Sequence, residues 1–209
     1  MISAVAALTE GIVTGDTALV CSGEFDKVTP SPRCWISPGA HGALNVVSAL
    51  DVSCHTYFYE VGYQLGQDEE GNYDSDKGVE TLAKYTEMFG LGETTGLEIP
   101  ESEPQISDEY SVQSAIGQGT NNFTVSQLNR YVAAVANKGT VYKLSLLSKT
   151  TDPDGKIIKN YEPTVVSTID EVSDETWNLV HQGMISMINR NASFSGLGIQ
   201  MAGQTGTAP

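Results

Sequence analysis

Residues able to do chemistry gather in two short stretches of this chain. The first is Ser53-Cys54-His55, ahead of an aromatic-rich segment, and the second is Gly203-Gln204-Thr205-Gly206-Thr207. Taken alone, a serine at the start of a helix is often only its N-cap, and a lone histidine is more often structural than functional. The second stretch follows apolar residues and is typical of a strand, in which Gly206 lets another extended backbone approach closely. We therefore expect another group to approach the end of this strand closely.

The cysteines Cys21, Cys34 and Cys54 form a third candidate set. They contain no Cys-x-x-Cys pair, and together with His41 they match no standard zinc spacing. We therefore expect no metal site and no cofactor. Cys21 and Cys34 flank a turn-rich stretch, where a disulfide and free thiols both stay open, because sequence alone does not place the Cα atoms.

Composition limits the classes of partner. The 209 residues carry a formal net charge of −15 and no basic stripe that would meet phosphates, which excludes nucleic acid as a partner. No apolar run approaches the roughly 20 residues that a membrane span needs. The opening segment, Met1–Leu8, lacks a basic flank and predicts a helix instead of a signal peptide. The chain is expected to be globular.

Periodicity and capping residues predict a mainly helical chain whose strands come late. Helices are expected over Ile2–Leu8, Leu44–Leu50, Thr56–Leu65, Val79–Phe89, Val125–Asn137 (N-cap Thr124) and Asp174–Asn189 (N-cap Ser173). Strands are expected over Tyr142–Ser148 and Lys156–Tyr161, around a turn at 152–155, and over Ile199–Thr207. We expect a single partial domain over 1–209. Its mainly helical part, 1–140, has a turn-rich insertion near 15–42, and 141–209 supplies a hairpin, a helix and a final cleft strand.

Several segments, in their order and spacing, resemble one known family. They are Ala49–Tyr59, Phe89–Gly92 with Thr95–Pro100, Ala115–Gly119, Gln127–Gly139 and Gly203–Ala208. The first resembles the Ser-x-Asn motif and aromatic helix of the penicillin-binding proteins, and the last stands where that family carries Lys-Thr-Gly-Thr. The stretch over 89–100 is similar to the monofunctional (class B) branch. The resemblance implies an α/β (α+β) fold of the serine transpeptidase and β-lactamase kind, here an α-rich subdomain with part of the antiparallel sheet.

The resemblance also implies a chemistry. In the family, the serine of Ser-x-x-Lys attacks the carbonyl between the two residues of a D-Ala-D-Ala end, forms an acyl-serine and releases the last D-Ala. The acyl group then passes to an amine of a neighbouring peptidoglycan strand. Ser53 would be the catalytic serine of the second motif, which relays protons among nucleophile, lysine and leaving group. His55 takes the place of the asparagine that holds the substrate backbone.

The final motif implies the other substrate-binding residues. Gln204 stands at the position of the motif's lysine and supplies a hydrogen bond without a charge. Thr205 and Gly206 would lie along the substrate. By resemblance, Thr207 offers its hydroxyl to the substrate carboxylate and its N–H to the oxyanion hole.

Two features of the family pattern are missing, and three interpretations stay open. No serine is followed three residues later by lysine, and the strands that follow Lys-Thr-Gly are absent from the chain. The leading interpretation is a fragment of a peptidoglycan D,D-transpeptidase domain, inactive by itself. The second is a degenerate homologue that binds cell-wall peptides or partners without catalysis, which His55 and Gln204 support. A serine β-lactamase fits less well.

The resemblance implies partners and a location for the parent protein. Its ligands would be peptidoglycan stem peptides and β-lactams, at the extracytoplasmic face of the bacterial membrane, with membrane attachment only through an N-terminal anchor outside this chain. A Cys21–Cys34 bridge would suit that compartment. Without sheet neighbours, the strand Ile199–Thr207 would be unpaired or added to a second copy, a route to self-association.

Overall fold

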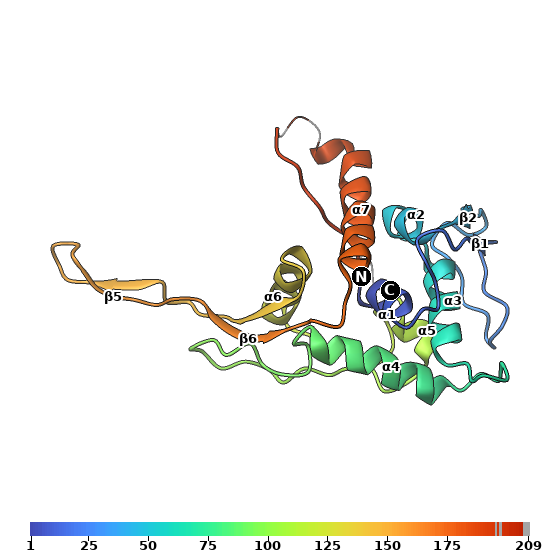
Figure 1. The fold of residues 1–209 in the computed structure, drawn as a ribbon, viewed down its shortest axis with the longest axis horizontal. Coiled ribbons are helices and arrows are strands. Elements are labelled where there is room, and N and C mark those ends of the chain that lie inside the picture. Colours follow the sequence, from blue (N-terminus) through green and yellow to red (C-terminus); the bar gives the residue numbers. More distant parts are fainter. Residues whose placement is uncertain (195, 197, 207–209) are drawn as a thin grey trace. The chain divides into compact units, whose positions relative to one another are not determined.

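The computed structural model describes residues 1–194, 196 and 198–206. Its helices are α1 (Ile2–Thr9), α2 (Val46–Asp51), α3 (His55–Leu65), α4 (Ser75–Met88), α5 (Ser111–Ser114), α6 (Val125–Ala136), α7 (Asp174–Arg190) and the 3-10 turn η1 (Ala192–Phe194) (Figure 1). Its strands are β1 (Leu19–Cys21), β2 (Gly42–Leu44), β3 (Thr140–Lys143), β4 (Lys149–Thr151), β5 (Ile157–Asn160) and β6 (Thr164–Thr168). The chain divides into two compact units. The first unit is Met1–Tyr85, Ser107–Asn121 and Glu171–Pro209, and the second is Thr86–Ile106 and Asn122–Asp170.

The helices begin where side chains satisfy the first backbone N–H groups. Asn45 and Ser48 form a reciprocal capping box at α2, and Thr124 and Gln127 form another at α6. The Ser173 side chain accepts a backbone hydrogen bond at the start of α7. The expected helices are confirmed with shifted boundaries, and so are the expected N-caps Thr124 and Ser173.

Helix α7 is the central element of the first unit. It packs on α1 and α2, while α3 packs on α1 and α5. Two glycines permit the closest approaches: a Cβ on Gly183 of α7 would lie 2.6 Å from Cβ of Leu50 in α2, and one on Gly62 of α3 would lie 2.5 Å from the Ser111 carbonyl oxygen of α5. Only a residue without a Cβ fits these contacts. Helix α2, which leads into Ser53, is thereby held against α7.

Among the described residues, the strands form three separate antiparallel pairs, β1–β2, β3–β6 and β4–β5. The turn expected at 152–155 is confirmed, because it joins β4 to β5 (Figure 1). The strand expected over Tyr142–Ser148 is wrong in its extent. Strand β3 ends at Lys143, and the N–H of Leu144 donates to the Thr95 carbonyl oxygen at 3.0 Å instead of to a strand partner. The sequence analysis did not foresee β1, β2 or β6.

The strand expected over Ile199–Thr207 is not formed in its described part, 199–206. A strand forms only where a neighbouring strand takes up its backbone donors and acceptors. Here the N–H of Gly203 donates to the Met184 carbonyl oxygen of α7 at 3.2 Å, so a helix holds the segment instead of a sheet. Thr207 lies outside the described residues.

A buried arginine organises the second unit. Arg130 of α6 has only 2% of its side chain exposed, and its guanidinium donates to three backbone carbonyl oxygens of the preceding loop. The acceptors are Thr94 (3.1 Å from Nη1), Glu93 (3.0 Å from Nη2) and Gly90. Charged donors make stronger hydrogen bonds than neutral ones, so these contacts fix the loop against α6.

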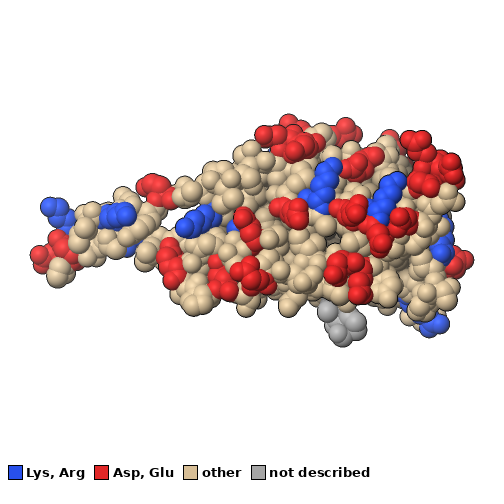
Figure 2. All heavy atoms as spheres, turned by 90° about the horizontal axis from the view of Figure 1, so that it is seen from below, with Lys and Arg blue, Asp and Glu red and all other residues tan. Residues whose placement is uncertain are grey.

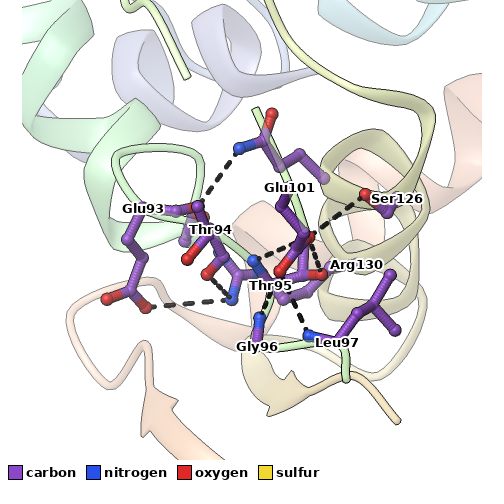
Figure 3. Close-up of polar contacts among 10 residues, drawn as sticks. Glu93, Thr94, Thr95, Gly96, Leu97, Glu101, Ser126 and Arg130 are labelled. Atoms are coloured by element: carbon purple, nitrogen blue, oxygen red, sulfur yellow. Dashed lines mark hydrogen bonds and ion pairs between the residues drawn. The ribbon is translucent and has the colours of Figure 1, made fainter. Parts of the chain in front are cut away.

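The carboxylate of Glu101 also holds this loop (Figure 3). One oxygen accepts the N–H groups of Gly96 (2.7 Å) and Leu97 (3.1 Å), and the other accepts the N–H (3.2 Å) and hydroxyl (2.5 Å) of Thr95. Ser126 of α6 adds a longer bond of 3.4 Å. The stretch Thr95–Pro100 thus has a structural role in this unit.

Acidic side chains are scattered over the molecular face drawn in Figure 2 and outnumber the basic ones there, in keeping with the net charge of −15. Such a surface favours solubility and disfavours polyanionic ligands. Within the part of the chain that the structure describes, no helix is both long and apolar enough to cross a membrane.

Candidate functional site

Ser53 lies in a strained turn between α2 and α3. Its φ is +50°, a value that residues with a Cβ seldom adopt. A backbone hydrogen bond stabilises the turn: the Ser53 N–H donates to the Leu50 carbonyl oxygen at 3.2 Å. The indole N–H of Trp35 donates to the carbonyl oxygens of Val52 (3.1 Å) and Ser53 (3.0 Å). The N-cap of α3 is Cys54, so the Ser53 hydroxyl is left for another task.

The segment after α7 brings its side chains to that hydroxyl. The amide Nε2 of Gln204 donates to Ser53 Oγ at 3.0 Å, and Ser53 Oγ lies 2.5 Å from Thr205 Oγ1. Residues about 150 positions apart in the chain thus form one hydrogen-bonded trio. Two adjoining hydroxyls can pass a proton between them, and the amide fixes the orientation of the first.

The trio stands at a cleft of about 830 Å³ in the first unit. Ser53, His55 and Thr205 all line it, so three of the residues that the sequence analysis singled out share one cavity. The His55 ring packs edge-on against Tyr59, with ring centroids 6.1 Å apart. Gly206 is exposed with open space where a Cβ would stand, and it is not among the residues that line the cleft.

Other residues that the sequence analysis did not identify also line the cleft. Arg33 and Trp35 line it from the loop before β2, and Arg190 lines it from the end of α7. No spacing rule connects these residues with Ser53, because the contact depends on how the 22–41 loop folds back over α3.

The cysteines come together beside this turn. Strand pairing places Cys21 opposite Gly42 and therefore next to His41, while Cys54 caps α3. Nδ1 of His41 lies 3.5 Å from the Cys21 sulfur and 3.6 Å from that of Cys34, and all four ligand atoms lie within 4.8 Å of one another. The three cysteines are free thiols and are buried, so the disulfide that the sequence left open is not formed.

Three sulfurs and one imidazole nitrogen at these separations can hold one tetrahedral Zn²⁺ ion. Nε2 of His41 is buried without a hydrogen-bond partner. A hydrogen bond from the Cys54 thiol lowers the pKa of Cys34 and favours its thiolate, while the same bond raises the pKa of Cys54, so one of these two sulfurs is ready for a metal and the other must lose its proton on binding. The expectation of no metal site relied on linear spacing. The fold supplies a proximity of these four side chains that the spacing does not show.

Comparison with known proteins gives the family. The family model described as the penicillin binding protein transpeptidase domain matches residues 1–209. The chain is 27% identical to the peptidoglycan D,D-transpeptidase MrdA of Escherichia coli, over 98% of this chain and 34% of that protein. It is 30% identical to MrdA of Acinetobacter baumannii, over 95% of this chain and 30% of that protein. The chain therefore spans about a third of the length of these relatives.

Solved structures agree on the fold. A chain of a peptidoglycan synthase complex superposes with a TM-score of 0.80 at 25% identity, over 98% of this chain and 34% of that one. Penicillin-binding protein 2B of Streptococcus pneumoniae superposes with a TM-score of 0.79 at 24% identity, over 99% of this chain and 37% of that one. The order of motifs, the cleft and these matches lead to one conclusion: the chain belongs to the penicillin-binding protein transpeptidase family.

Proposed function

We propose that this chain is the part of a peptidoglycan D,D-transpeptidase that binds the D-Ala-D-Ala end of a stem peptide and moves protons during its cleavage. The observation that carries the proposal is the hydrogen-bonded trio Ser53, Gln204 and Thr205, two members of which, Ser53 and Thr205, line one cleft. The relatives named as peptidoglycan D,D-transpeptidases support the same substrate. The parent protein would work at the extracytoplasmic face of the cell membrane, where that substrate lies.

In this proposal Ser53 is the proton relay of the second motif. Gln204 orients Ser53 Oγ through its amide, and Thr205, whose hydroxyl lies against Ser53 Oγ, would lie along the peptide. His55 would contact the peptide backbone from α3. No serine of the chain is followed three residues later by lysine, so the acyl-serine step is assigned to none of its residues.

Peptide binding tests this proposal. We expect N-acetyl-Lys(acetyl)-D-Ala-D-Ala to quench the fluorescence of Trp35, which is 58% exposed at the cleft, and the L-Ala-L-Ala peptide to leave it unchanged. A Gln204→Lys variant should bind about fivefold more tightly, because a charge-assisted bond exceeds a neutral one by about 1 kcal/mol. Gln105→Lys, which adds the same charge at an exposed site in the second unit, is the matched control.

Covalent labelling tests the assignment of roles. A fluorescent penicillin should leave no band on a denaturing gel, because an acylated serine needs a lysine beside it and an oxyanion hole. A labelled band that disappears in Ser53→Ala would show that Ser53 is a nucleophile and would contradict its role as a relay.

A second candidate is a non-catalytic module that binds cell-wall components. The neutral Gln204 and the imidazole of His55 favour it, since both replace family residues that contact substrate. Failure of the D-Ala-D-Ala peptide to bind to the wild type or to Gln204→Lys would select this candidate over the first.

A further inference from the structure

Two positively charged side chains line the cleft that holds Ser53, although the chain as a whole is strongly acidic. The sequence has three arginines, Arg33, Arg130 and Arg190, against a net charge of −15. Arg130 is buried in the second unit, where backbone carbonyls take up its donors. The other two both line the cleft that holds Ser53. Arginine binds carboxylates through a planar pair of donors, so this placement suits an anionic ligand.

The two cleft arginines differ in how they are engaged. Arg190 is paired within the protein: its Nε lies 3.3 Å from the Asp51 carboxylate, and Nη2 donates to the Asp51 carbonyl oxygen at 2.5 Å. Arg33 has a side chain that is 71% exposed, and its nearest carboxylate, Glu24, lies 3.9 Å away. A pair at that distance on an exposed surface contributes little, so Arg33 can exchange Glu24 for a ligand carboxylate.

The backbone of Arg33 is nonetheless fixed. Arg33 forms a β-bridge with Glu24, and its carbonyl oxygen accepts the Tyr59 hydroxyl at 3.4 Å. Two residues further on, Trp35 is anchored through its indole N–H while 58% of the residue stays exposed at the cleft. The exposed guanidinium of Arg33 therefore lies close in the chain to the anchored indole ring of Trp35, and both line the cleft.

We infer that the cleft recognises a peptide that carries a second carboxylate, on a side chain before its D-Ala-D-Ala end, and that Arg33 is the residue that binds this carboxylate. The peptide backbone packs over Trp35, and the charge on Arg33 supplies attraction that the neutral Gln204 does not. This inference rests on the proposed function, since it places the same peptide in the same cleft. Arg33 is thus a specificity-determining residue.

The experiment compares two peptides that differ in one side chain, N-acetyl-Glu-D-Ala-D-Ala and N-acetyl-Gln-D-Ala-D-Ala, by the quenching of Trp35. We expect the Glu peptide to bind the wild-type chain about fivefold more tightly, and the preference to shrink in high salt. The general field of a chain with net charge −15 works against the Glu peptide, so a preference for it needs a local cation.

Arg33→Gln should bring the ratio of the two affinities to about one. Lys77→Gln removes the same charge from an exposed site outside the cleft lining and should keep the preference. Equal affinities in the wild type, or a preference that survives in Arg33→Gln, would overturn the inference while binding of the Gln peptide upholds the proposed function. Binding of neither peptide would contradict both.

Discussion

Replacing Arg130 with glutamine should destabilise the second unit strongly. The guanidinium is 2% exposed and donates to the carbonyl oxygens of Gly90, Glu93 and Thr94. Glutamine is shorter and uncharged, so at least two of these three carbonyls, of which one is buried and two are part-buried, lose their charged donor. Each lost bond to a charged group costs about 1.5–3 kcal/mol, which gives a loss of about 4 kcal/mol in the free energy of unfolding.

Urea denaturation followed by far-UV circular dichroism measures this loss. With an m-value of about 2 kcal/mol/M, the transition midpoint should fall by about 2 M. The unfolding of the second unit should separate from that of the first, whose Trp35 and Trp177 report by fluorescence. Lys156→Gln, which removes a charge from an exposed turn, should leave the midpoint unchanged. A loss below about 1 kcal/mol for Arg130→Gln would refute the assignment of Arg130 as the organising residue of this unit.

Two further outcomes are expected. The chain purified without chelators should contain one Zn²⁺ per molecule by elemental analysis, and the Cys34→Ser and His41→Ala variants should lack it. A wild type without metal, or metal retained in both variants, would argue against a zinc site formed by the three cysteines and His41. Partial desolvation raises the pKa of Glu101, but the hydrogen bonds from Thr95 and its neighbours outweigh it and leave that pKa below the ordinary value. A carboxyl group whose pKa is depressed in the folded state stabilises the protein at pH values above its unfolded-state pKa, which is about 4.3 for glutamate. The difference in the free energy of unfolding between wild type and Glu101→Gln should therefore be constant from pH 7 to about 5 and vanish as the pH falls below about 4. A difference that grows on acidification would contradict this sign.

Local chemistry explains which elements the sequence predicts. The caps Thr124 and Ser173 act on backbone groups within three residues of themselves, so their helices could be placed without knowledge of the fold. The extended segment that ends in Thr205 and Gly206 was misassigned as a strand, because a strand depends on a partner elsewhere in the chain. Its contact with Ser53 followed only from resemblance to a family.

The metal-ligand cluster was missed for a physical reason. Cys21 and His41 become neighbours through the register of β1 and β2, and Cys54 joins them because it begins α3. None of these relations has a fixed spacing in sequence. The same holds for Arg33, whose approach to the cleft depends on the fold of its loop and not on any periodicity.

The contact at Gly183 has a consequence for how this protein can vary. Helix α2 leads to Ser53 and helix α7 anchors Gly203, so the distance between the two halves of the cleft is set where these helices touch. A methyl group at position 183 would come within 2.6 Å of Leu50 and would force the helices apart. Changes in the shape of the cleft must therefore arise at other positions, and position 183 should tolerate no other residue although it does not line the cleft.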